Sequence, residues 1–142
     1  MKKATMVLNF RHIQFLVLSL LLMVSLNTQA QNEVLTNGRI ALKNGSAKEL
    51  AKYFSDIVEV NFDGAKATYS KTQAEFVLKD FFRRYPPLSF EYIHQGSSKE
   101  GLKYSIGKYT YEGGHFRVYM LIKKINGIFV IDTLEFSKDL SK

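Results

Sequence analysis

The chain contains no cysteine. Its absence excludes disulfide cross-links, thiolate nucleophiles, thiolate metal sites and covalently attached haem. It also excludes a lipid anchor on a cysteine behind an export signal. Any stable fold of this chain must therefore be held together by the burial of side chains alone.

Several other functional patterns are missing. Beyond the N-terminal segment, basic residues form no run longer than the pairs Arg83-Arg84 and Lys123-Lys124, so the basic stripe of a nucleic-acid groove is absent. No serine-centred nucleophile elbow and no glycine-rich loop opening a helix occur. His94 and His115, with no acidic residues at ligand spacing around them, fit no metal-binding pattern. We therefore expect no nucleic-acid partner, no metal and no cofactor.

The first 30 residues have the order of a secretory signal peptide. Lys2-Lys3 and Arg11 precede the apolar run Ile13–Leu26, and Thr28-Gln29-Ala30 supplies small and polar residues at its end. The apolar run is shorter than the roughly 20 residues that span a bilayer. The sequence therefore predicts cleavage after Ala30, export to the periplasm or the cell exterior, and no integral membrane anchor in the mature chain.

Cleavage at this point would leave residues 31–142, enough for one domain with a modest core. The formal charge of +7 would fall, because the leader carries basic residues and no acidic ones. Of the 8 Tyr and 11 Phe, only Phe10 and Phe15 lie in the leader. Each buried ring removes on the order of 150–250 Å² from water. We expect a single domain whose aromatic core replaces disulfide bonds.

Three helices are expected in the first half of the domain. A short one over residues 34–42 ends at Asn44-Gly45. Two capping boxes, Ser46 with Glu49 and Ser70 with Gln73, begin the other two, and Pro86-Pro87 ends the third. In both helices, apolar residues recur at helical spacing and define the face that should be buried. In the second helix these residues are Ala47, Leu50, Ala51 and Phe54. In the third helix they are Ala74, Val77, Leu78, Phe81, Phe82 and Tyr85.

Strands are expected around and after the third helix. A strand over residues 57–62 is followed by an Asp63-Gly64 turn and a short piece over residues 67–69. A meander of four antiparallel strands then covers residues 88–95, 102–111, 115–124 and 128–136. The fold class is therefore α+β, with N-terminal helices packed on an antiparallel sheet.

Two hairpins fix the expected register. If Gly113-Gly114 and Asn126-Gly127 are two-residue loops, paired residue numbers sum to 227 and 253. Ile106, Leu121 and Asp132 then form one cross-strand row, while the other face pairs Met120 with Thr133 and Ile122 with Ile131. Both faces are substantially apolar, so we expect the outer face to be covered, most simply in a homodimer.

Three sequence runs carry a resemblance to a known family. SKTQAEFVLKDFF (70–82), PPLSFEYIHQGSS (86–98) and GLKYSIGKY (101–109) resemble a small exported bacterial family of unknown function, DUF4783-like, in the nuclear-transport-factor-2-like superfamily, which includes SnoaL and ketosteroid-isomerase-type proteins. The resemblance covers about residues 40–136. It implies a cone-shaped α+β fold, a pocket between sheet and helices, and dimerisation through the outer sheet face. It implies no reaction, because the superfamily contains both enzymes and non-catalytic binding domains.

His94 is the first candidate for chemistry, because histidine can act as a general base near neutral pH without perturbation. Phe90, Tyr92 and His94 alternate, so a regular strand would direct the imidazole with the two rings toward the cone. Tyr92, Tyr104 and His94 are the candidate ligand-binding residues, although Tyr104 also suits a core or a dimer interface. The alternative for His94 is structural, with its ring nitrogens tying the turn of residues 94–98 to the backbone.

Asp132 is the second candidate base. It lies in the middle of a strand beside Leu121 in the expected register, where an unpaired buried carboxylate would be neutralised or would find a partner. The alternative is a strand-end carboxylate near solvent. His115, directly after Gly113-Gly114, is expected to be a solvated hairpin residue.

Two hypotheses for function follow. The first is an exported, non-catalytic homodimer that binds a small apolar ligand or serves as an accessory or adaptor domain. The second is a small isomerase or dehydratase that uses His94 or Asp132 as general base in the cone pocket. A cone pocket of roughly several hundred Å³ with both residues inside favours the enzyme, and a closed core with both outside favours the binding domain.

Overall fold

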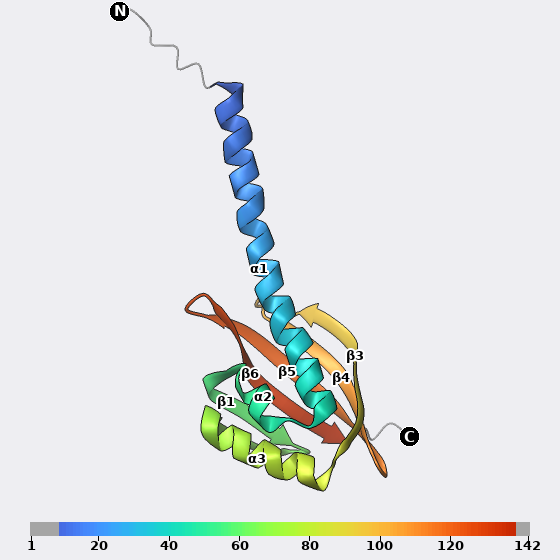
Figure 1. The fold of residues 1–142 in the computed structure, drawn as a ribbon. Coiled ribbons are helices and arrows are strands. Elements are labelled where there is room, and N and C mark those ends of the chain that lie inside the picture. The colour runs from blue at the N-terminus through green and yellow to red at the C-terminus, as the bar shows by residue number, and fades with distance from the viewer. Residues whose placement is uncertain (1–8, 139–142) are drawn as a thin grey trace, which may run out of the picture.

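The computed structural model describes residues 9–138. In this part of the chain, six strands form one curved sheet and three helices lie on one of its faces (Figure 1). The strand order is β2-β1-β6-β5-β4-β3, in which β1 and β6 run parallel and all other neighbours are antiparallel. The elements are α1 (Phe10–Asn44), α2 (Ala47–Ala51), β1 (Phe54–Phe62), β2 (Ala65–Ser70), α3 (Lys71–Arg84), β3 (Pro87–Ser97), β4 (Lys103–Tyr111), β5 (Gly114–Ile125) and β6 (Ile128–Lys138).

Helix α1 is much longer than the expected helix over residues 34–42. It continues without a break through Ala30, and its first half extends away from the domain (Figure 1). The reason is that its sequence contains no proline and a single glycine, Gly38. The helix ends where expected, at Gly45, whose φ of 62° is left-handed. No helix in the described part of the chain is long and apolar enough to cross a membrane.

Helix α1 passes close to the sheet at Gly38. A β-carbon at this position would lie 3.4 Å from Met120 Cε and 3.5 Å from Tyr92 Oη. The Tyr92 hydroxyl donates a hydrogen bond of 2.7 Å to the Leu35 carbonyl oxygen and so ties β3 to α1. Burial raises the pKa of Tyr92 well above the ordinary value for tyrosine.

The second predicted helix is shorter than expected, because Phe54 belongs to β1 and not to α2. The Ser46 hydroxyl accepts a hydrogen bond from the Glu49 N–H, but the Glu49 carboxylate binds Lys52 and does not return to the N-cap. Phe54 is nevertheless buried as predicted. The third helix forms as expected, with both hydrogen bonds of the capping box between Ser70 and Gln73.

The core between α3 and the sheet is filled by aromatic rings. Phe81 of α3 lies 4.9 Å from Phe62 and 4.4 Å from Phe136, measured between ring centroids. Tyr109 and Phe116 pack against the same ring from β4 and β5. All but the partly buried Phe62 are less than 9% exposed, so the interior of the cone is packed beneath α3.

The first predicted hairpin register is wrong by two residues. The loop is Glu112-Gly113, so paired residue numbers of β4 and β5 sum to 225 and Ile106 lies opposite Tyr119. Only Gly113 has a positive φ, 103°, which gives a turn with one left-handed position and not the two expected. A shift of two residues keeps every side chain on its predicted face.

The second register is correct near the turn and then changes. Ile122 pairs with Ile131 as expected, and Asn126 and Gly127 both have positive φ. Beyond this point Asp132 is an extra residue in β6, so Met120 pairs with Leu134 and not with Thr133. The predicted cross-strand row that contained Asp132 is therefore wrong, because a bulge interrupts the pairing.

The aromatic core leads to a stability prediction with a matched control on one helix. Phe81→Ala should lower the free energy of unfolding by about 3–5 kcal/mol, because it opens a cavity among the packed rings. Phe76→Ala, also on α3, removes a ring that is 69% exposed and should change stability by at most about 0.5 kcal/mol. Urea unfolding followed by circular dichroism measures both, and equal losses would contradict this description of the core.

The hydroxyl of Tyr92 leads to a prediction with a pH dependence. Tyr92→Phe should cost about 1 kcal/mol at pH 7, because it removes a partly buried hydrogen bond. The raised pKa means that the contribution of Tyr92 is complete below about pH 10, where the unfolded chain begins to ionise, and is lost as the pH rises further. The difference between parent and variant should therefore shrink by roughly 1.4 kcal/mol per unit above pH 10.

The control is Tyr104→Phe at pH 7, which removes the same atom where its partner, His94, is exposed. It should be nearly neutral. A cost for Tyr104→Phe as large as that for Tyr92→Phe would contradict the assignment of the buried contact.

Candidate functional site

The sheet opens at one point between β1 and β6. Their parallel pairing joins Phe54 to Ile131 and resumes only at Glu59 and Thr133. Residues 55–58 of β1 therefore lie opposite Asp132 alone, and β1 departs from its neighbour over this stretch. The buried Ser55 lies in this segment, and its hydroxyl donates a hydrogen bond to the Ile57 carbonyl oxygen.

The bulge at Asp132 on the other side of β6 falls at the same place. Asp132 therefore pairs neither with β1 nor with β5. Bulges are frequent next to functional sites, because they terminate pairing and redirect side chains. The two irregularities together identify this end of the sheet as the candidate site.

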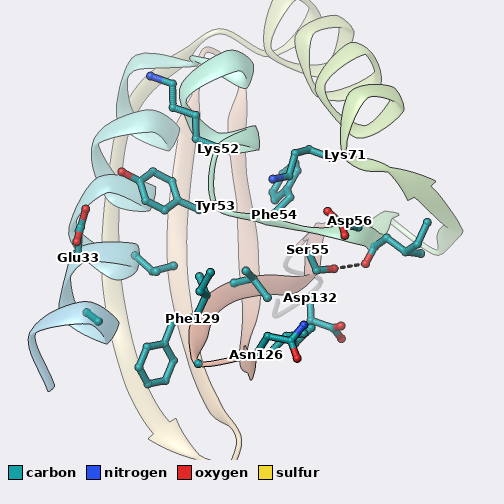
Figure 2. Close-up of a pocket in the computed structure, with 17 residues that line it drawn as sticks. Glu33, Lys52, Tyr53, Phe54, Ser55, Asp56, Lys71, Asn126, Phe129 and Asp132 are labelled. Atoms are coloured by element: carbon teal, nitrogen blue, oxygen red, sulfur yellow. Dashed lines mark hydrogen bonds between the residues drawn. The ribbon is translucent and has the colours of Figure 1, made fainter. Parts of the chain in front are cut away.

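A cleft of about 770 Å³ lies at this opening (Figure 2). Its walls come from segments that are distant in sequence: α1, the α2–β1 connection, the first residues of β1, the start of α3 and the β5–β6 hairpin. The volume lies within the range of roughly 300–1,000 Å³ that is typical of small-molecule sites. Lining residues include Glu33, Val34, Tyr53, Asp56, Ile57, Lys71, Ile125, Ile128, Phe129 and Asp132.

Much of the lining is apolar although it contacts water. Ile57, Ile125 and Ile128 are 59%, 44% and 66% exposed, and all three line the cleft. Phe129, which follows Ile128 in β6, also lines the cleft (Figure 2). Large aliphatic side chains that gather around one concave surface are typical of ligand sites and interfaces.

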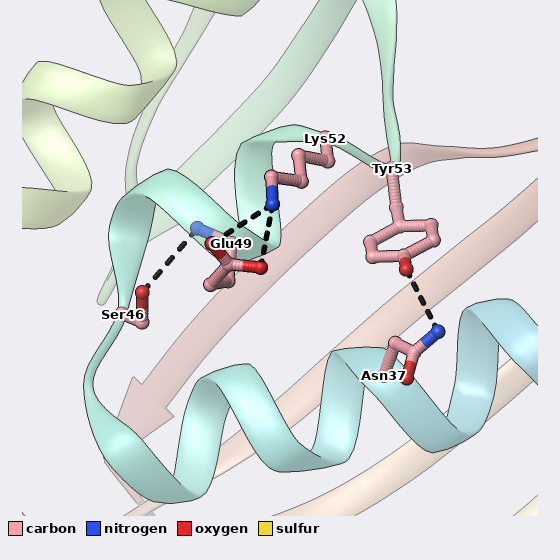
Figure 3. A network of polar contacts seen from close by, with 5 residues as sticks. All are labelled: Asn37, Ser46, Glu49, Lys52 and Tyr53. Atoms are coloured by element: carbon pink, nitrogen blue, oxygen red, sulfur yellow. Dashed lines mark hydrogen bonds and ion pairs between the residues drawn. The ribbon is translucent and has the colours of Figure 1, made fainter.

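Tyr53 is held in place at the α1 wall. Its hydroxyl accepts a hydrogen bond of 2.7 Å from the Asn37 amide of α1, as Figure 3 shows. Its carbonyl oxygen accepts another, also 2.7 Å, from the Ile131 N–H. A ring fixed at both ends offers a preformed surface with little entropy left to lose on binding.

The charged residues of the cleft fall into two groups. Lys52 binds Glu49 at 2.8 Å, and this hydrogen bond with the charge of Glu49 raises the pKa of Lys52 (Figure 3). Asp132 binds Lys123 at 2.7 Å. The second group consists of Lys71, Glu33 and Asp56, which have no ion-pair partner among residues 9–138. The charges of these three side chains are therefore available to a bound molecule.

His94 does not share the face of Phe90 and Tyr92. The register of β3 and β4 shifts between Tyr92 and His94, and the extra residue, Ile93, turns the histidine to the outer face of the sheet. There the exposed imidazole lies 3.1 Å from the Tyr104 hydroxyl, measured from Nε2, outside the aromatic core. The expectation from regular alternation was wrong, because one inserted residue reverses the side of every later side chain.

The other candidates are dispersed. Tyr104 stacks on Tyr119 on the outer face, with ring centroids 6.0 Å apart. Tyr92 lies on the helix side, where it borders a shallower groove with Arg39 of α1. His115 is half-buried beside Thr110, next to the β4–β5 hairpin. No cluster of residues suited to a metal occurs within residues 9–138.

The cleft therefore contains one of the predicted candidates, Asp132, and not His94, Tyr92 or Tyr104. Sequence reasoning missed Tyr53, Lys71 and the hairpin residues that build it. One signal was available: an Asn-Gly turn between two isoleucines, Ile125 and Ile128, places large apolar side chains at a hairpin tip, where polar residues are usual.

Comparison with known proteins gives the family. Crystal structures of DUF4783 family proteins from Bacteroides ovatus and Bacteroides uniformis are 29% and 28% identical to this chain, with TM-scores of 0.67 and 0.68. Each alignment covers 72% of this chain, and 92% and 94% of the respective relative. An NTF2-like protein of unknown function from Shewanella baltica is 13% identical, with a TM-score of 0.60, over 80% of this chain and 94% of its own, and shows the fold alone.

No protein of curated function matches the chain. The expected α+β fold of the nuclear-transport-factor-2-like superfamily is confirmed by these structures. The family model for the domain of unknown function DUF4783 matches residues 35–137, and the chain belongs to this family.

Proposed function

We propose that this chain is an exported, non-catalytic binding or accessory domain that holds a small apolar ligand in the cleft at the β1–β6 opening. The observation that carries the proposal is the contrast between two spaces. The cone beneath α3 is filled by Phe81 and its neighbouring rings, whereas the cleft is concave, lined by exposed isoleucines and large enough for a small molecule.

The geometry gives less support to an isomerase or dehydratase. A general base must lie within hydrogen-bond reach of its substrate, and His94 is on the outer face, away from the cleft. Asp132 does line the cleft, but its carboxylate is paired with the Lys123 ammonium. The Asp132 Oδ2 atom is therefore already engaged within the protein.

Export and dimerisation are part of the same proposal. The family match begins at Leu35, shortly after the predicted cleavage site at Ala30, which is consistent with a mature domain that starts near residue 31. On the outer face, Tyr104, Ile106, Tyr119 and Leu121 remain partly exposed in the single chain, although they form an apolar patch on adjacent strands. A second copy related by two-fold symmetry is the simplest cover for such a patch.

Native mass spectrometry of the protein, purified gently from cells that export it, tests these points together. The expected species is a dimer of chains that begin at Gln31, each carrying a small adduct that organic solvent removes. Retention of residues 1–30 would contradict export with cleavage. A monomer would contradict a homodimer that buries the outer face of the sheet. A dimer without adduct would contradict a resident ligand.

The dimer interface has its own test. Ile106→Glu should weaken dimerisation at least about 100-fold, because a two-fold interface would bury two unpaired carboxylates. Analytical ultracentrifugation measures the dissociation constant, and circular dichroism verifies the fold. The control, Phe76→Glu, places the same charge on exposed α3 at the other face of the sheet and should leave the dimer intact. An Ile106→Glu protein that dimerises like the parent would exclude this face as the interface.

A further inference from the structure

We infer that the ligand class of the cleft is an aliphatic acid, a molecule with an alkyl chain and one carboxylate, of which a saturated fatty acid is the simplest case. This inference rests on the proposed function, since it requires that the cleft binds a small apolar molecule. It adds the chemistry of both ends of that molecule, which follows from the distribution of side chains along the walls.

The alkyl chain has a matching surface on the hairpin side. Ile57 of β1 and Ile125 and Ile128 of the β5–β6 hairpin expose their aliphatic side chains toward water around the cleft. Phe129 adds an aromatic ring, and the Lys124 Nζ atom lies over that ring, 5.4 Å from its centroid. Burial of these groups against a hydrocarbon removes apolar area from water on both partners, which is the main source of affinity in such sites.

The carboxylate has a matching charge at the start of α3. Lys71 is the first residue of this helix, it lines the cleft, and it has no ion-pair partner in the described part of the chain. The first turn of α3 contains no acidic residue, so the positive end of the helix dipole is not offset by a side chain of that turn. Lys52 also lines the cleft (Figure 2), but its ammonium group is bound by Glu49 at 2.8 Å, so the available charge on this side is that of Lys71.

The acidic residues restrict where the carboxylate can bind. Glu33 projects from α1, on the wall opposite Lys71 (Figure 2), so an acid bound at Lys71 avoids it. Asp56 is on the same side as Lys71 and is exposed, so water screens much of its repulsion. The Asp132 carboxylate is paired with Lys123. The chain of the ligand should therefore extend from Lys71 toward Ile128 and Phe129.

The test compares three probes of equal chain length. Isothermal titration with sodium dodecanoate, 1-dodecanol and dodecylamine uses the purified protein after removal of bound lipid, at concentrations below micelle formation. Dodecanoate should bind at one molecule per chain and at least about tenfold more tightly than the alcohol, a difference that corresponds to one added charge contact. Dodecylamine should bind more weakly than dodecanoate.

Two variants test whether the probe binds in the cleft. Lys71→Met keeps an apolar side chain of similar length and should weaken dodecanoate about tenfold while leaving dodecanol unchanged. Ile128→Ser removes part of the apolar wall and should weaken both probes. Lys79→Met, on an exposed part of the same helix outside the cleft, is the matched control and should change neither.

The outcomes separate this inference from the proposed function. Equal binding of acid and alcohol, or tighter binding of the amine, would overturn the aliphatic-acid assignment and leave an apolar ligand site in place. Binding of dodecanoate that is insensitive to both Lys71→Met and Ile128→Ser would overturn the location. Absence of binding by all three probes would overturn both the inference and the cleft as an apolar ligand site.

Discussion

The packing of Phe81 against rings from four different strands is the interaction on which the rest of the structure depends. The chain has no cysteine and so no disulfide between its helices and its sheet, and this ring contacts Phe62, Tyr109, Phe116 and Phe136 at once. The same packing fills the interior of the cone, where the family resemblance led us to expect a pocket. The cone is therefore used for stability, and the concave surface available to a ligand lies at the end of the sheet.

Element order and most helix and strand positions could be predicted from the sequence, because capping boxes, apolar spacing and turn residues are local signals. The capping box at Ser70 and the Asn126-Gly127 turn are examples in which the chemistry of a few residues decides the outcome. Helix α1 was underestimated because the predicted leader and the predicted domain helix contain equally good helix formers. No residue marks a boundary between them.

The candidate site was predicted poorly, and the reason is physical. A bulge adds one residue without changing composition, so Ile93 and Asp132 each altered the face or pairing of their neighbours in a way that no spacing rule detects. The cleft itself combines α1, β1, α3 and a hairpin, and proximity between such distant segments is a property of the tertiary fold. Sequence reasoning identified Asp132 as unusual and could not identify what surrounds it.

The parallel pairing of β1 with β6 has a consequence for how the chain reaches its native state. β6, the last strand in the described part of the chain, lies between β1 and β5. The sheet therefore stays divided into β2-β1 and β5-β4-β3 until β6 pairs with β1 on one side and β5 on the other. Because contacts between segments as distant in sequence as β1 and β6 form slowly, we expect the insertion of β6 to be a late step of folding.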